Sequence, residues 1–291
     1  MKTAVMTDSN SGITKEEADS LGIFLLPMPV IIDGETYFEG VNLEQEMFYE
    51  SLTGGREVST SQPSPGSLMD FWKEILSKGY EEIVHIPMSS GLSSSCGTAL
   101  TLAEDFDGKV EVVDNHRISV TMRIAVMEAA HMAKEGKSAL EIKKNLEERA
   151  YHSSIYITVD TLEFLKKGGR VTAAAAALGT VFHIKPVLSI QGGKLDAFAK
   201  TRGLKKAKGT VVAALQKDLS ERFPGVDARY VRVGAAGSGL TAQEAKEWRE
   251  LLQAAFPGVD VYYDPLSFSI SCHTGPGAYG AGFSVVQDRD V

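Results

Sequence analysis

The sequence has very few cysteines, since only Cys96 and Cys272 occur among its 291 residues. Two cysteines form neither a disulfide framework nor a zinc-binding spacing, so we expect a reduced protein. Basic residues are also in deficit, because 30 Lys and Arg stand against 38 Asp and Glu and give a net charge of −8. This balance argues against nucleic acid and an anionic membrane surface as default partners.

Long hydrophobic runs are missing as well. No window approaches the ~20 apolar residues of a membrane-spanning helix, and the opening residues MKTAVMTDS lack the apolar segment of a signal peptide. We therefore expect a cytoplasmic protein with at most transient membrane contact. The esterase elbow, the Ser-Lys pair and the phosphate-binding loop are absent too. Their absence argues against ester cleavage and ATP hydrolysis by this chain, and neither a metal nor a cofactor is expected.

The first half of the chain alternates short apolar runs with helical stretches, which favours a parallel sheet covered by helices. These apolar runs lie at 2–7, 22–32, 81–87, 109–114 and 154–159. The second half differs, because 185–200 contains two strand-like runs around Gly-Gly, the signature of an antiparallel hairpin. The sequence thus predicts an α/β fold, with a parallel α/β domain at 1–160 and a smaller α+β domain with antiparallel strands at 161–291.

The stretch HIPMSSGLSSSCGTA, residues 85–99, follows an apolar run with five hydroxyls. Ser93 and Ser94 are expected at the start of a helix, where free N–H groups and the helix dipole favour a negative charge. One serine suffices as a helix cap, so five hydroxyls indicate an anion-binding site. Thr60 and Ser61, in TSQPSPG, offer further hydroxyls before a helix, although an ordinary helix cap followed by prolines is the better explanation of that segment taken alone.

His273 lies in the glycine-rich segment SCHTGPGAYGAG, which we expect to be a loop whose histidine can donate a hydrogen bond to a carboxylate. Arg170 and Arg202 belong to the basic segments LKKGGRV and TRGLKKAKG. We expect both arginines outside the hydroxyl cluster, either contacting an acidic partner or a phosphate, or simply solvated at helix ends. The other histidines are expected to be structural or surface residues: His85, His116, His131, His152 and His183.

Taken in order, these stretches resemble the DegV family of bacterial fatty-acid-binding proteins, which includes the binding subunits of fatty acid kinase. The resemblance spans nearly the whole chain and is carried by TDSNSG, TSQPSPG, SSGLSSS, VDTLEFLKKGGRV, KPVLSIQGGKL and HTGPGA. The sequence departs from the family's usual serine motif, Ser-Ser-x-Leu-Ser-Gly-Thr-Tyr, at its last three places. These hold Ser94, Ser95 and Cys96.

The resemblance implies a two-domain protein that encloses one long-chain fatty acid between its domains. A separate fatty acid kinase catalytic subunit would phosphorylate the bound carboxylate to acyl-phosphate for phospholipid synthesis, and an acyltransferase is a further candidate partner. Arg170 and Arg202 would contact the kinase or the acyl-phosphate. The alternative left open is an enzyme of the dihydroxyacetone-kinase-like group that uses His273 or Ser93 covalently. The positions that match the family's carboxylate-binding residues are Thr60, Ser61, Ser93, Ser94 and His273.

Overall fold

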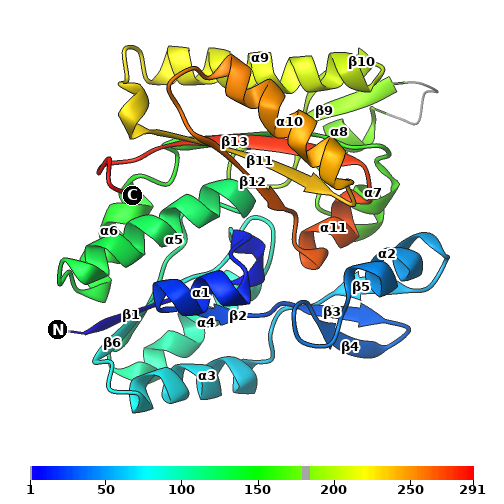
Figure 1. The fold of residues 1–291 in the computed structure, drawn as a ribbon. Helices are drawn as coiled ribbons and strands as arrows, with labels where there is room; N and C mark the ends of the chain where they lie inside the picture. Colours follow the sequence, from blue (N-terminus) through cyan, green and yellow to red (C-terminus); the bar gives the residue numbers. More distant parts are fainter. Residues whose placement is uncertain (1, 179–183) are drawn as a thin grey trace.

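The computed structural model describes residues 2–178 and 184–291. A four-stranded parallel sheet with the order β2-β1-β6-β7 forms the lower layer in Figure 1. Its two faces are covered by α1, α5 and α6 on one side and by α3 and α4 on the other. The strands of this sheet are β1 (Thr3–Asp8), β2 (Ile23–Leu26), β6 (Glu82–Ile86) and β7 (Val110–Val112). The helices are α1 (Lys15–Leu21), α3 (Pro65–Ser77), α4 (Ser95–Ala103), α5 (Ser119–Lys134) and α6 (Ala139–Glu148).

A six-stranded mixed sheet with the order β10-β9-β8-β13-β11-β12 forms the upper layer, and α9 and α10 cover its outer face. Helix α5 contacts both sheets and therefore lies between them. The strands are β8 (Ser153–Thr158), β9 (Ile184–Ile190), β10 (Asp196–Arg202), β11 (Val231–Ser238), β12 (Val261–Pro265) and β13 (Ala278–Val285). The covering helices are α9 (Leu204–Arg222) and α10 (Ala242–Ala255).

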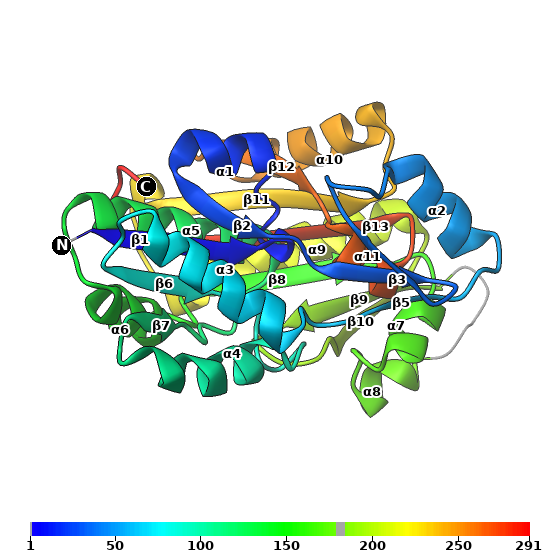
Figure 2. The same cartoon turned by 90° about the horizontal axis from the view of Figure 1, so that it is seen from below.

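A small antiparallel sheet, β4-β3-β5, lies at one end of the molecule beside α11 (Figure 2). Its strands and the helix α2 form a separate apolar cluster that includes Phe268 and Cys272 of α11. The elements at this end are β3 (Pro29–Ile32), β4 (Glu35–Phe38), β5 (Val58–Thr60), α2 (Gln45–Thr53), α7 (Glu163–Gly168), α8 (Ala173–Ala176) and α11 (Phe268–Thr274). Short 3-10 turns complete the chain at Ser9–Ser11, Glu104–Phe106 and Ala228–Tyr230.

The predicted fold class is confirmed, with a parallel sheet flanked by helices and a second sheet that contains antiparallel strands. The hairpin expected at 185–200 is formed by β9 and β10, which pair antiparallel. No helix of the described chain combines the length and the apolar character needed to cross a membrane.

The run at 154–159 and the second part of the run at 22–32 do not join the parallel sheet, contrary to the sequence prediction. The run at 154–159 forms β8, which pairs antiparallel with β9 and β13. Every residue of β8 is buried, and such a strand looks the same in a parallel sheet and in the middle of a mixed one. The run at 22–32 divides at Pro27 and Pro29 because proline cannot donate to a ladder. Its first part, β2, joins the parallel sheet, and its second part, β3, joins the small antiparallel sheet. The predicted domain boundary at residue 160 stays a prediction.

Candidate functional site

A cavity of about 330 Å³ lies where the two large sheets and α11 approach one another. Most of its wall is apolar and comes from α5, α7, α11 and the strands of the six-stranded sheet. Hydroxyl groups from β5 and from the loop before α4 gather at one end. The apolar lining includes Ile118, Val120, Ile155, Ile157, Leu165, Ile190, Leu195, Ala236, Leu266, Gly280 and Ala281.

All five residues predicted to bind a carboxylate line this one cavity. The Thr60 hydroxyl lies 2.9 Å from Nε2 of His273 and shares a hydrogen bond with it. Ser93 and Thr60 are half-buried, whereas Ser61 and Ser94 are exposed, so the polar end of the cavity is also the end that reaches the surface. A ligand with one polar and one apolar end fits this distribution.

Gln62, a polar residue of TSQPSPG outside the predicted carboxylate-binding set, connects the two hydroxyl-bearing segments. Its side-chain oxygen accepts hydrogen bonds from the hydroxyls of Ser94, at 3.0 Å, and Thr98, at 2.9 Å. The Ser93 hydroxyl in turn accepts a hydrogen bond from the N–H of Ser95 at 3.2 Å, which fixes the loop at the start of α4. The serine loop and the segment after β5 are therefore held as one unit.

His273 does not lie in a loop, as the glycine-rich sequence suggested, but in the last turn of α11. Ser267 caps this short helix by accepting from the N–H of Ile270, and Gly275 ends it with φ of +71°. Burial, with a smaller contribution from the Arg170 charge, lowers the pKa of His273 to about 4. The imidazole is consequently neutral at pH 7 and can donate one hydrogen bond and accept another.

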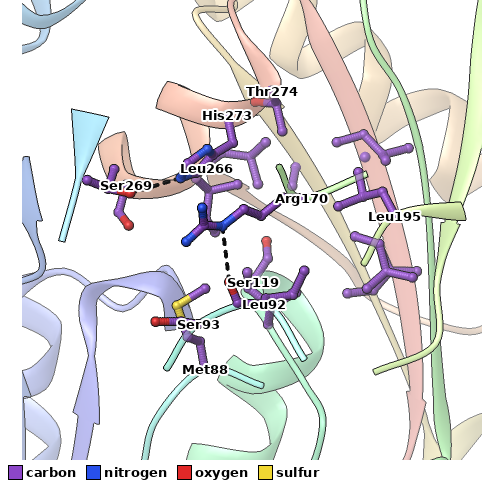
Figure 3. Close-up of a pocket in the computed structure, with 18 of the residues that line it drawn as sticks. Met88, Leu92, Ser93, Ser119, Arg170, Leu195, Leu266, Ser269, His273 and Thr274 are labelled. Atoms are coloured by element: carbon purple, nitrogen blue, oxygen red, sulfur yellow. Dashed lines mark hydrogen bonds between the residues drawn. The ribbon is translucent and has the colours of Figure 1, made fainter. Parts of the chain in front are cut away.

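Arg170 lines the same cavity as the hydroxyls, although the sequence analysis placed it outside the cluster. Figure 3 shows its side chain extending into the space between His273 and Ser93. Its Nε donates to the carbonyl of Leu92 at 3.2 Å, and its terminal nitrogen donates to the carbonyl of Gly168. The chain turns back after α7 because Gly169 adopts φ of +68°, and this turn carries Arg170 into the cavity.

Arg202 lies elsewhere, at the exposed end of β10, and is not part of the cavity wall. The five serines of residues 85–99 also lie in different environments. The Ser89 hydroxyl donates to the carbonyl of Gly192 in the β9–β10 turn, and the Ser95 hydroxyl borders a second, much smaller cavity beside His85. Only Ser93 and Ser94 of the five line the large cavity.

Ser119 and Ser269 are cavity residues that the sequence analysis missed. Ser119 follows Ile118 in HRISV, and Ser269 is one of three serines in SFSIS. No local pattern distinguishes either serine from ordinary helix-end residues. Their position becomes visible only when α5 and α11 are packed against the sheets.

One group of three possible metal ligands occurs in the described ranges, away from this cavity. His131, Glu135 and Asp288 place one ligand atom each within 4.8 Å of one another, on α5 and the C-terminal segment. A direct hydrogen bond explains part of this proximity, because His131 Nε2 lies 3.1 Å from the Asp288 carboxylate. Of the other histidines, His85 is buried, His116 stacks on Tyr151, and His183 lies outside the described residues.

Known proteins resemble this chain along almost its full length. The sequence profile described as "Uncharacterised protein, DegV family" matches residues 2–286. A DegV domain-containing protein of Deinococcus radiodurans is 31% identical over 284 residues, which cover 96% of this chain and 97% of the relative. Protein DegV of Bacillus subtilis is 32% identical over 285 residues, which cover 96% and 98%.

Two solved structures share the fold. One is described as "Fatty Acid Binding of a DegV family Protein from Thermus thermophilus"; it has a TM-score of 0.87 and 28% identity, and covers 98% of this chain and 100% of its own. The other is DegV, "a fatty acid binding protein from Bacillus subtilis", with a TM-score of 0.83 and 30% identity. The match covers 98% of this chain and 99% of the Bacillus subtilis chain. The profile match over residues 2–286 and the relatives that align over nearly their whole length show that this chain belongs to the DegV family.

Proposed function

We propose that this protein binds one long-chain fatty acid and presents its carboxylate to a separate kinase subunit, which forms the acyl-phosphate used in phospholipid synthesis. The observation that carries the proposal is the cavity itself. Its wall is mostly apolar, and the residues predicted to bind a carboxylate all line it: Thr60, Ser61, Ser93, Ser94 and His273. Related proteins from Thermus thermophilus and Bacillus subtilis, described as binding fatty acids, support the same ligand class.

The energetics favour such a ligand. Burying each methylene contributes about 0.8 kcal/mol, so some fourteen of them contribute on the order of 11 kcal/mol before ordering costs. A carboxylate would oppose burial by several kcal/mol if it had no partner. Hydrogen bonds from Ser, Thr and neutral His, together with the nearby charge of Arg170, can offset this cost.

The location of the polar end fits a carrier that hands its ligand to a partner. Ser61 and Ser94 are exposed, so a carboxylate bound there can be reached from outside while its chain stays in the apolar part. In this proposal the chain is a cytoplasmic carrier and the kinase supplies the ATP chemistry. Arg202, exposed at the end of β10, is proposed as a contact for the kinase.

Two arginine variants test whether different residues bind the ligand and contact the kinase. Arg202→Ala should leave fatty acid affinity unchanged and lower acyl-phosphate formation, because its side chain does not line the cavity. Arg170→Ala should weaken fatty acid binding about five- to a hundredfold, because it removes a charge beside the carboxylate. Isothermal titration with palmitate and a coupled assay with a cognate kinase measure the two effects.

Lys246→Ala, an exposed lysine of α10 paired with Glu250, serves as the control for a simple loss of surface charge. A loss of fatty acid affinity in Arg202→Ala, or unchanged kinase coupling in that variant, would refute the assigned role of Arg202. Wild-type affinity in Arg170→Ala would remove this arginine from the carboxylate site.

A further inference from the structure

Helix α5 begins at Ser119 in a conformation that serine rarely adopts, with φ of +53°. Non-glycine residues in this left-handed region are strained, and such strain gathers at ligand-binding positions where the surrounding structure maintains it. Glycine would occupy the same backbone conformation with less strain. What serine adds at this position is a hydroxyl group.

The start of α5 is buried and has no cap. Ile118 stands at the N-cap position and its side chain makes no capping hydrogen bond. Within residues 2–178 and 184–291, no group accepts a hydrogen bond from the N–H of Ser119, Val120 or Thr121. All three residues are less than one-tenth exposed, so bulk water does not readily replace the missing acceptors.

These free donors border the ligand cavity. Ile118, Ser119 and Val120 all belong to its wall. Ser119 is 8% exposed, and its hydroxyl forms no hydrogen bond within the described part of the chain. Figure 3 shows Ser119 among the cavity residues, with Leu92 and Arg170 close to it in that view. A strained backbone, an unpartnered hydroxyl on a residue that is 8% exposed and an uncapped helix start therefore coincide at one place.

The rest of the fold fixes this helix start rigidly. The Val120 carbonyl accepts a hydrogen bond from the Tyr262 hydroxyl at 2.7 Å. Gly234 and Gly282 pair with each other in β11 and β13, and a side chain on Gly234 would approach the Val120 side chain to 2.6 Å. The absence of side chains at these glycines lets α5 lie close against the sheet, which holds the donors in position before a ligand arrives.

We infer that the Ser119 hydroxyl and the N-terminus of α5 bind an anionic oxygen of the ligand's head group. This inference rests on the proposed carrier function and adds a second group of donors to the predicted carboxylate-binding residues. A carboxylate and a phosphoryl group share the required chemistry, since both present negatively charged oxygens that a helix N-terminus favours.

The test separates the effect of losing the Ser119 hydroxyl from the effect of relieving the backbone strain. Ser119→Gly removes the hydroxyl and relieves the strained backbone, so the melting temperature should stay the same or rise while ligand affinity falls about five- to a hundredfold. Ser119→Ala removes the hydroxyl but keeps the strain, and should lose the same affinity without gaining stability. Asp107→Gly is the matched control, because Asp107 has φ of +50°, is exposed and lies outside the cavity.

Palmitate and an alkylphosphonate of the same chain length are titrated into each variant by calorimetry. An affinity loss for palmitate assigns the site to the carboxylate, and a loss confined to the phosphonate assigns it to the phosphoryl group. Wild-type affinity for both probes in both Ser119 variants would overturn the inference. A wild-type protein that binds neither probe would instead refute the carrier function itself.

Discussion

Gly168 occupies a position where a single methyl group would collide with His273. A Cβ atom built on Gly168 would lie 2.0 Å from Nδ1 of the imidazole. The residue ends α7 without a positive φ, so the backbone itself would accept alanine. Its carbonyl also accepts a hydrogen bond from Arg170. Gly168 is therefore a positioning residue for the two basic side chains of the cavity.

This contact predicts a strong coupling between the two positions. Gly168→Ala should displace the imidazole from Thr60 and lower fatty acid affinity about five- to a hundredfold, the loss that we also expect for His273→Ala because it removes the donor. In the His273→Ala background the same substitution should change affinity little, because the group it displaces is gone. Calorimetric titration of the wild type, the two single variants and the double variant with palmitate gives the affinities of this double-mutant cycle.

Gly97→Ala, in α4 with no atom within 4 Å of the added Cβ, is the control for alanine at a helical glycine. Additive losses in the double variant would contradict the positioning role.

Thr60, Ser93 and His273, which the sequence singled out, line one cavity, whereas the location of Arg170 in the same cavity was not predicted. Thr60 and Ser93 stand out as clustered polar residues at the ends of apolar runs, which is a local signal. The location of Arg170 depends on the turn at Gly169 and on the packing of α7 against α11. Ser119 gave no signal because the role proposed for it depends on backbone conformation, which the local sequence does not reveal.

Strand β13 forms part of the cavity wall because Gly280 has no side chain there. The three atoms nearest to a Cβ atom on Gly280 all belong to the Ile157 side chain, at ordinary contact distances of 3.6 to 3.8 Å. Gly280 pairs with Ile157 on one side and with Ala236 on the other, and all three line the cavity. The space available to an acyl chain is thus set by a small residue in the middle of the sheet.

Enlarging this residue should shorten the acyl chain that binds. Gly280→Ile adds a branched side chain that a strand accepts well, and we expect it to fill cavity space. Each methylene that can no longer be buried should cost about 0.8 kcal/mol, or roughly fourfold in affinity. Titrations with saturated fatty acids of increasing length should show a shorter optimum than in the wild type.

Gly280→Ala is the conservative control and should shift the optimum less, because its Cβ meets only ordinary contacts. An unchanged length profile in Gly280→Ile would show that the acyl chain does not reach β13.

The elements themselves were largely predictable, whereas their assignment to sheets was not. Helix α6 follows from its apolar spacing and from the capping box formed by Ser138 and Glu141. The turn at Gly192 and Gly193 predicted the β9–β10 hairpin correctly. Strand β8 was assigned to the wrong sheet because its partners, β9 and β13, follow it in the chain by many residues. Pairing over such distances has no local signature.

For the whole molecule, the arrangement of layers explains why a cavity exists at all. Helix α5 packs against both large sheets, and its start, the serine loop and α11 surround the space between them. A ligand that fills this space would join groups from both halves of the chain. It would also stabilise the folded state, because a ligand that binds only the folded protein raises its apparent stability.

The most direct test is mass spectrometry of the purified protein under native and then denaturing conditions. We expect a native mass larger than that of the chain by one long-chain fatty acid, which is lost on denaturation and recovered as free fatty acid by organic extraction. A mass without added ligand, together with no binding of added palmitate or oleate, would contradict the carrier function. An adduct that survives denaturation would also contradict it, and would instead favour covalent chemistry at Ser93 or His273.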